Sequence, residues 1–567
     1  MTATSIATQP GKVSGSSVAT GAPSPPPPTA AAAALPADLS HSPVLGILGV
    51  ILGAGIVTLA GRLLSLGLAD LKGNVGIGFD DGAWLSSAFN VALMFIGPLT
   101  VYLGALLGAR PVLLTCAGVF TVVSACLPFI HSYSLLIVLL AIAGLAAGTF
   151  YPLTLTFALR NIPLQYLALT LGLYATCIEG AVNFMPSLYG FYRDYLSWKW
   201  MFWTSAVVTP VMMACVYFGI PPAPRPQRSG QPPSFVGFFY ASAGFALVFA
   251  ALDQGQRLDW WHSGLFTGLF TAGTFLLLCA VVRRLRAPNP LVDLPYLRKW
   301  NTIALGFGLY AFRFSLLATI IVVPQSLSFR GLDAAQFGPA VLWTAVAELS
   351  MAVFAAHLLN KGLDSRLLMA TGFATIACVC LLNAEVTSEW AAENYFRTEL
   401  PMAVGQSFAF VGLVGTIVLQ AFVSGGLNSP QRSLTFSAFF HVVRLFGGQI
   451  GVAVMGRFIA EQEKVHSFLL GIHVRAGDWI TDQTVRQLTA GLAAKSAGVA
   501  AAAGRAVGIT AGSVRLQAYS LTFIDAFHFI AWTCFATLLL IATLRPFPLN
   551  YRDLAAFGAG RHDGARG

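Results

Sequence analysis

Two glutamates, Glu179 and Glu348, lie near the middle of long apolar stretches of the sequence. At the centre of a membrane helix, an ionisable side chain costs about 2.5–3.5 kcal/mol on insertion scales, so each one is a candidate for function. A carboxyl in that setting can take up a proton on one side of a membrane and release it on the other. We expect Glu179 to be the principal proton-coupling group and Glu348 the reserve. A structural ion pair or hydrogen bond is the alternative for both.

Four basic residues in similar stretches are candidate partners for these carboxyls: Arg62, Arg313, His441 and Arg444. His441 and Arg444 are three residues apart and therefore share one face of a predicted helix. Asn183 likewise stands one helical turn after Glu179. For Arg444, a structural ion pair is the favoured alternative.

Glycine, proline and aromatic residues near these groups suggest how a binding cavity could form and move. Gly180, Pro186 and Gly190 follow Glu179, and a proline inside a helix removes a hydrogen bond and can kink the helix. We expect these three residues to act in gating. The candidates for lining a substrate cavity are Tyr174, Asn183, Tyr310, Phe312 and Trp343. Packing or lipid contact is the alternative for the aromatic residues.

Fourteen apolar stretches must position these side chains, and each is long enough to cross a bilayer, which takes about 20 residues. They are residues 43–69, 83–107, 111–130, 133–159, 164–191, 198–219, 234–252, 262–282, 300–323, 336–358, 366–384, 401–426, 434–459 and 522–544. The runs are continuous and lack the ten-residue alternation of barrel strands, so we predict an all-α polytopic membrane protein.

The composition supports this fold class and excludes others. Of 567 residues, 56% are hydrophobic and only 10% are charged. Soluble domains carry about 25% charged residues, so this chain has far more apolar surface than a soluble fold can bury. The net charge of +10 comes without a nucleic-acid-binding motif, and all eight cysteines fall in apolar segments, unlike those of a secreted disulfide framework. We find no metal-binding or cofactor-binding motif and no catalytic cluster, so we expect no cofactor, no metal and no enzymatic activity.

The orientation follows from the positive charges, because short cytoplasmic loops carry the excess of Arg and Lys. With both tails inside, twelve basic residues fall in short inward loops and six in short outward loops. The inward ones are Arg110, Arg160, Arg225, Arg228, Arg283, Arg284, Arg286, Arg298, Lys299, Lys361, Arg366 and Arg432; the outward ones are Lys72, Arg193, Lys199, Arg257, Arg330 and Arg397. Both termini are therefore predicted to be cytoplasmic, and residues 460–520 to form an outward loop.

Several fragments, in this order, resemble the major facilitator superfamily, specifically its EmrB/QacA-type fourteen-span drug:proton antiporter branch. Gly104-Ala-Leu-Leu-Gly-Ala-Arg110 is similar to the family's loop between spans 2 and 3. Gly180-Ala-Val-Asn-Phe-Met-Pro-Ser-Leu-Tyr-Gly190 resembles the antiporter motif of span 5, and Trp198-Lys-Trp-Met-Phe202 its Trp-Arg-Trp-Ile-Phe. Arg444-Leu-Phe-Gly-Gly-Gln-Ile-Gly-Val-Ala453 is similar to the Arg-Gln-Leu-Gly-Gly-Ser-Ile-Gly-Val-Ala of span 13.

The chain departs from this pattern at residues that the family links to proton coupling and gating. Gly53 stands where span 1 usually has an acidic residue, and Leu140 and Ala143 replace the Arg and Gln of the span 4 motif. The missing acid at Gly53 is the reason for expecting Glu179 to take over the proton.

The resemblance implies two six-helix bundles, residues 43–219 and 300–546, with two inserted spans in residues 220–299. Residues 1–42 would be a disordered cytoplasmic tail and residues 547–567 a second tail. The resemblance to this family also implies a secondary transporter of a bacterial inner membrane that exports amphipathic or aromatic compounds in exchange for protons. An importer or uniporter of the same fold, and a polytopic enzyme or sensor, are the alternatives.

In placement, segment 460–520 resembles the loop of exporters that work with a periplasmic membrane-fusion adaptor; a merely solvated loop is the alternative.

The charge asymmetry yields a direct test of topology. A reporter that is active only in the cytoplasm should be active when fused after Arg566 and silent when inserted near Ser496. The reverse pattern would overturn the orientation and every loop assignment derived from it.

Overall fold

The computed structural model describes residues 43–161, 166–220, 235–286, 299–423, 430–496, 498–546 and 550–553. These residues are almost entirely helical and include no strand. Fourteen of the helices are long and apolar enough to cross a membrane, which confirms the predicted fold class. Helices are the expected solution, because a helix satisfies its backbone hydrogen bonds within itself where no water is present. The predicted tail 1–42 and most of the tail 547–567 lie outside the described residues.

The first six spans make up the N-bundle, in which α1 packs against α6, α7 and α8, and α3 packs against α5. Its helices are α1 (Pro43–Leu66), α2 (Leu68–Val75), α3 (Phe79–Leu107), α4 (Ala109–Cys126), α5 (Tyr133–Ala147), α6 (Phe150–Asn161), α7 (Leu167–Tyr195) and α8 (Trp200–Gly219). Here α5 and α6 together form the fourth span, and α2 is a short helix between the first two.

Two inserted spans, α9 (Phe235–Gln254) and α10 (Gly264–Leu285), pack against each other, and α9 also packs against α3 and α17. The last six spans make up the C-bundle. They comprise α12 (Trp300–Ser315) with the π-helix η5 (Ala318–Val322) and α13 (Val323–Ser328), then α14 (Ala334–Asn360), α15 (Ser365–Asn383), α16 (Ala392–Val423), α17 (Pro430–Gly471) and α19 (Val499–Ala542).

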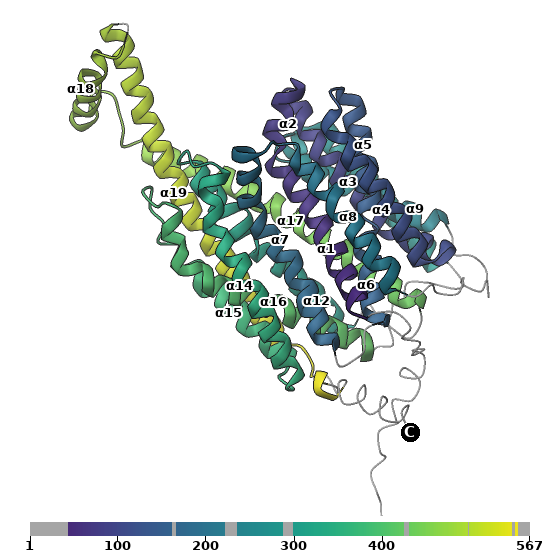
Figure 1. Ribbon diagram of the computed structural model, residues 1–567. Coiled ribbons are helices and arrows are strands. Elements are labelled where there is room, and N and C mark those ends of the chain that lie inside the picture. Colours follow the sequence, from purple (N-terminus) through teal and green to yellow (C-terminus); the bar gives the residue numbers. More distant parts are fainter. Residues whose placement is uncertain are drawn as a thin grey trace, which may run out of the picture.

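The two sides of the bundle differ in what projects from them. Helix α18 (Trp479–Ala493) and the first part of α19 extend well beyond the other helices, as Figure 1 shows at its upper left. We call this side the α18 side. The opposite side, from which α1 starts and to which α19 returns, is the terminal side (Figure 1).

Most of segment 460–520, which the sequence predicts as an outward loop, is helical. Helix α17 continues to Gly471, α18 follows, and α19 begins at Val499, more than twenty residues before the predicted start of its span. The Ala-rich stretch from Ala490 to Ala511 lies partly in α18 and partly in α19. Alanine is the best helix former, so these helices persist where hydropathy no longer indicates a span.

Glycines allow several helices to approach closely. Gly144 of α5 and Gly148, which caps this helix, lie against the backbone of α3, an approach that small residues permit. The tightest contact with backbone is at Gly372 of α15, where an added Cβ would overlap the backbone nitrogen of Ala409 in α16. Backbone atoms cannot move aside as a flexible side chain can, so this contact requires glycine.

We therefore expect Gly372→Ala to destabilise the protein. Overpacking typically costs about 1–3 kcal/mol, so the melting temperature of the purified protein in detergent should fall by several degrees. Gly268→Ala in α10 is the matched control, because no described atom lies within 4 Å of the added methyl group. Equal melting temperatures for the two variants would contradict the assigned contact between α15 and α16.

Candidate functional site

The N-bundle and the C-bundle meet most extensively where α7 packs along α14. Gly190 of α7 lies against the backbone of Ala335, at 2.6 Å from the position of an added Cβ. Gly180 faces Glu348 of α14, whose Oε2 would lie 3.6 Å from such a Cβ. Pro186 occupies the interior of α7 between these two glycines. The three residues predicted to act in gating thus stand on the helix that forms the main contact between bundles.

Glu179 of α7 faces Arg313 of α12 across this interface. Its Oε1 lies 3.7 Å from Nη1 of Arg313, and the two side chains are 3% and 17% exposed. Arg444 of α17 is also near enough to interact with the charge of Glu179. No described residue donates a hydrogen bond to either oxygen of Glu179. The pair therefore joins the bundles by charge and leaves the carboxyl oxygens free for a proton or a ligand.

Aromatic rings surround the second arginine. Arg444 lies over the ring of Tyr151 from α6, with its guanidinium carbon 4.0 Å from the ring centroid. The imidazole of His441 stacks on the same ring at 5.0 Å, and Tyr174 of α7 meets it edge to face at 5.6 Å. All four side chains are buried. A cation over an aromatic face is stabilised by the ring quadrupole, so the ring of Tyr151 helps to hold the charge of Arg444 at the interface.

Glu348 belongs to a hydrogen-bonded network that also crosses the interface. Asn183 of α7 donates from Nδ2 to Oε1 of Glu348 at 3.1 Å and to Oε1 of Gln406 in α16 at 3.2 Å. Gln406 in turn donates to the hydroxyl of Thr319, which lies in the π-helix η5. Such short π-helical segments occur frequently at functional sites. Glu348 thus has neutral partners, whereas Glu179 has cationic ones.

A third buried carboxyl, Glu399 of α16, is not among the site residues predicted from the sequence. Thr344 of α14 donates a hydrogen bond to it, and it is only 2% exposed. The predicted span began at residue 401, whereas α16 begins at Ala392. Tyr395 and Thr398 lower the local hydropathy, yet both are buried as well. Extending the helical pattern back through these positions would have placed Glu399 inside the bundle.

Two further contacts join the bundles towards the α18 side. Arg193, at the end of α7, forms an ion pair of 2.6 Å with Asp333, the residue that caps α14. This hydrogen bond from Arg193 holds the pKa of Asp333 below its ordinary value. Arg62 of α1 donates from Nη2 to the carbonyl of Ile320 in η5 at 3.0 Å. The α18 side of the interface is therefore closed by polar contacts.

The remaining cavity candidates lie in different settings. Phe312 is buried and stacks on Phe410 at 4.6 Å, within the C-bundle. Tyr310 is partly buried and lies against Gly447. Trp343 is 55% exposed, in a stripe of exposed apolar residues along α14 with Val346 and Leu349, so the structure does not bring it to the cluster.

Unpartnered polar atoms distinguish this cluster from an ordinary packed core. Within the described part of the chain, buried side-chain atoms without a hydrogen bond include both oxygens of Glu179, both ring nitrogens of His441, Nε of Arg313 and of Arg444, and the hydroxyls of Tyr151 and Tyr174. Leaving such a group unsatisfied costs about 1–3 kcal/mol, more if it is charged. These atoms lie close together at the interface between the two bundles, whereas buried polar groups of an ordinary packed core are paired.

Comparison with known proteins agrees with this architecture. The sequence model of the Major Facilitator Superfamily matches residues 50–452. "Fatty acid resistance protein FarB" of Neisseria gonorrhoeae is 23% identical over 414 residues, which are 71% of this chain and 78% of that protein. "Multidrug export protein EmrB" of Escherichia coli K12 is 24% identical over 416 residues, with the same coverage of both chains.

The fold also resembles a solved transporter structure. The crystal structure of the human organic anion transporter MFSD10 aligns with a TM-score of 0.52 at 14% identity, over 87% of this chain and 99% of that one. The family match covers well over half of the chain and includes the helices that carry Glu179, Arg313, Glu348 and Arg444. This protein, a multi-pass membrane transporter and not an enzyme, belongs to the major facilitator superfamily.

Proposed function

We propose that the protein is a proton-coupled exporter that moves amphipathic or aromatic compounds outward by alternating access to the interface between its bundles. One observation carries this proposal: the buried polar contacts of the site run from one bundle to the other. Glu179 and Tyr151 belong to the N-bundle, and their partners Arg313 and Arg444 belong to the C-bundle. Relative motion of the bundles must therefore make and break the surroundings of these charges. Relatives named for multidrug export and for fatty acid resistance support the direction of transport.

We assign the principal proton to Glu179. The family's usual acidic position in span 1 is Gly53, where an added Cβ would lie 2.6 Å from the methyl group of Thr154. An acidic side chain there would have to displace the side chain of Thr154. Glu179 has two oxygens that accept no hydrogen bond from the described residues, and an arginine 3.7 Å away that stabilises the ionised form. Glu348, whose hydrogen-bond partner is a neutral amide, is the reserve.

The substrate would contact the aromatic faces of Tyr151 and Tyr174 and the guanidinium of Arg444. These groups offer apolar surface and unpartnered polar atoms side by side, which suits a compound with both an apolar and a polar part. We place the protein in a bacterial inner membrane with both tails in the cytoplasm, so that the α18 side faces outward. Arg110 and Arg366, at span ends on the terminal side, support this orientation, because positive charge gathers on the cytoplasmic side.

The decisive variant is Glu179→Gln, which keeps size and hydrogen bonding but cannot titrate. In energised vesicles loaded with ethidium or dodecanoate as probes, uphill transport should fall to the level of vesicles treated with a protonophore, while probe binding is retained. Glu385→Gln, at an exposed carboxyl outside the spans, is the matched control and should transport normally.

Full uphill transport by Glu179→Gln with wild-type pH dependence would remove Glu179 from this role and favour Glu348. The same assay separates an exporter from a uniporter of this fold. Transport by a uniporter would be unaffected when the pH gradient is collapsed.

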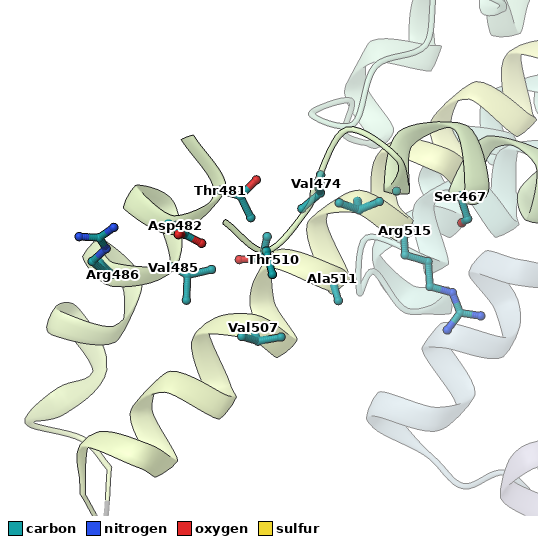
Figure 2. A pocket seen from close by; sticks show the side chains of 13 residues that line it. Ser467, Val474, Thr481, Asp482, Val485, Arg486, Val507, Thr510, Ala511 and Arg515 are labelled. Atoms are coloured by element: carbon teal, nitrogen blue, oxygen red, sulfur yellow. The ribbon is translucent and has the colours of Figure 1, made fainter. Parts of the chain in front are cut away.

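We further propose that the helical projection docks a periplasmic adaptor protein. A pocket of about 730 Å³ lies between the end of α17, α18 and the start of α19. Figure 2 shows the side chains that line it. Val474, Val485 and Val507 supply apolar walls, and Asp482 and Arg486 lie at the edge. Apolar surface accompanied by charged groups, on helices that project beyond the rest of the bundle (Figure 1), is typical of a protein-binding site.

Deletion of residues 485–512 tests this docking, because it removes most of α18 and the start of α19. Export by whole cells should be lost, whereas transport across the single membrane of a vesicle should continue. Unchanged export from whole cells would exclude adaptor docking at this projection.

A further inference from the structure

Asp253 is a carboxylate that the proton mechanism does not use, and it lies where the inserted spans meet both bundles. It is the penultimate residue of α9, towards the α18 side. Ser87 of α3, in the N-bundle, donates a hydrogen bond to its Oδ2. Gln449 of α17, in the C-bundle, donates to its Oδ1 at 3.2 Å. One carboxylate of an inserted helix thus holds a side chain from each bundle.

The neighbouring residues fasten α9 to the N-bundle. Gln254 donates to the hydroxyl of Ser87 and, at 3.4 Å, to the carbonyl of Ala83. Arg257 donates to the side-chain oxygen of Gln254 at 2.6 Å and to Asp80 at 3.0 Å. This chain of hydrogen bonds follows α3 from its first turn to Ser87. Helix α9 is therefore held to α3 by several polar contacts in this region.

The contact with the C-bundle is thinner. Apart from Asp253 and Gln449, it includes a small apolar cluster in which Phe249 of α9 packs with Met94 and Val442, and the ring pair Phe245 and Phe446 at 5.7 Å. An apolar contact slides at little cost, whereas a hydrogen bond to a carboxylate is directional and stronger than one between neutral groups. The Asp253 to Gln449 bond is thus the specific link between α9 and α17.

A comparable link joins the bundles where α7 meets α14. There Arg193 of α7 pairs with Asp333, which caps α14. Both links lie towards the α18 side, and each uses one carboxylate to hold a helix of one bundle to a helix of the other. The link between α3 and α17 differs, because its carboxylate belongs to the inserted helix α9.

We infer that Asp253 is a positioning residue that latches the α18 side closed, and that the inserted spans travel with the N-bundle and carry this latch. Opening of the α18 side must break the bond from Gln449 to Asp253 while the bonds along α3 persist. The inserted pair then has a part in alternating access, and does not merely fill the membrane beside the bundles. This inference rests on the alternating access proposed above.

The chemistry of the carboxylate suits this role. Its two oxygens accept hydrogen bonds from both bundles at once, which an amide with one oxygen does less well. Once the helices part, water replaces Gln449 as a donor, so the latch can open without leaving a buried charge unsatisfied.

The test measures the opening itself. Spin labels at Asp81→Cys in α3 and Val465→Cys in α17, both exposed positions towards the α18 side, report the distance between the bundles by pulsed electron resonance. The background is a cysteine-free protein shown to transport ethidium. Asp253→Ala should raise the ratio of long to short distances about tenfold, the value expected for loss of one hydrogen bond to a charged group. Asp253→Asn, which keeps an acceptor for Gln449, should restore most of the short distances.

Two further variants keep the inference falsifiable if Asp253→Ala folds poorly. Gln449→Leu removes the partner from the other bundle and should give the same shift, and the double variant should add little to it. Asp259→Asn is the matched control. This carboxylate of the inserted pair also reaches an arginine of α17, at 3.9 Å, but is 71% exposed. Exposed ion pairs contribute little, so the loss of this one should leave the distances unchanged.

An unchanged distance ratio in both Asp253→Ala and Gln449→Leu would overturn the latch. So would a lowered melting temperature without a change in distance, which is what a purely structural role would cause. The distance measurement needs no proton gradient. Failure of the proton assignment to Glu179 would therefore leave this result intact, and failure of the latch would leave the Glu179 assay unaffected.

Discussion

The structure depends on one constraint: charged and polar side chains that enter the membrane must find partners there, because water is absent. In this protein the partners are found across the interface between the bundles. Glu179 faces Arg313, Asn183 bonds to Glu348 and Gln406, and Arg444 lies over Tyr151. The two bundles therefore hold each other by contacts that are both specific and breakable, whereas apolar packing alone would not be specific.

The buried groups differ in how many hydrogen-bond partners they have. The network of Glu348 is built from amides and hydroxyls, and one of its carboxyl oxygens lacks a hydrogen bond from the described residues. Within the same part of the chain, Glu179 has charge partners but no hydrogen-bond donor, and Arg313 and Arg444 each retain an unpartnered Nε. A fully satisfied cluster would be a rigid anchor. A partly satisfied one gains stability when a proton or a polar ligand arrives, which a transport cycle requires.

Much of the fold could be predicted from the sequence, because the feature that makes a span is local. Apolar stretches of sufficient length were enough to place all fourteen spans. The boundaries failed where helices leave the apolar region. Polar residues around Thr398 concealed the start of α16 and with it Glu399, and the predicted seventh span stopped one residue before Asp253. The projecting end of α17 carries Glu461, Glu463 and Lys464, and the projecting start of α19 is rich in Ala and Gly, so neither was recognised as the continuation of a span.

The candidate site was predictable residue by residue but not as an arrangement. The cost of burying a charge singled out Glu179, Glu348, Arg313 and Arg444 from their positions alone. Which carboxyl meets which arginine depends on how α7 packs against α14 and α16 and so faces Arg313 of α12, more than a hundred residues away along the chain. No local pattern encodes that pairing. Tyr151, which contacts both His441 and Arg444, was not among the aromatic candidates, because nothing in its own stretch distinguishes it from the many other aromatic residues of the spans.

The central claim is that Glu179 is the carboxyl that changes protonation at the bundle interface. Infrared difference spectra of the purified protein, recorded between acidic and alkaline buffers, observe this change directly through the carbonyl stretch of a protonated carboxyl. We predict a difference band that is present in the wild type and in Glu348→Gln and absent in Glu179→Gln. A band that persists unchanged in Glu179→Gln and disappears in Glu348→Gln would contradict the claim.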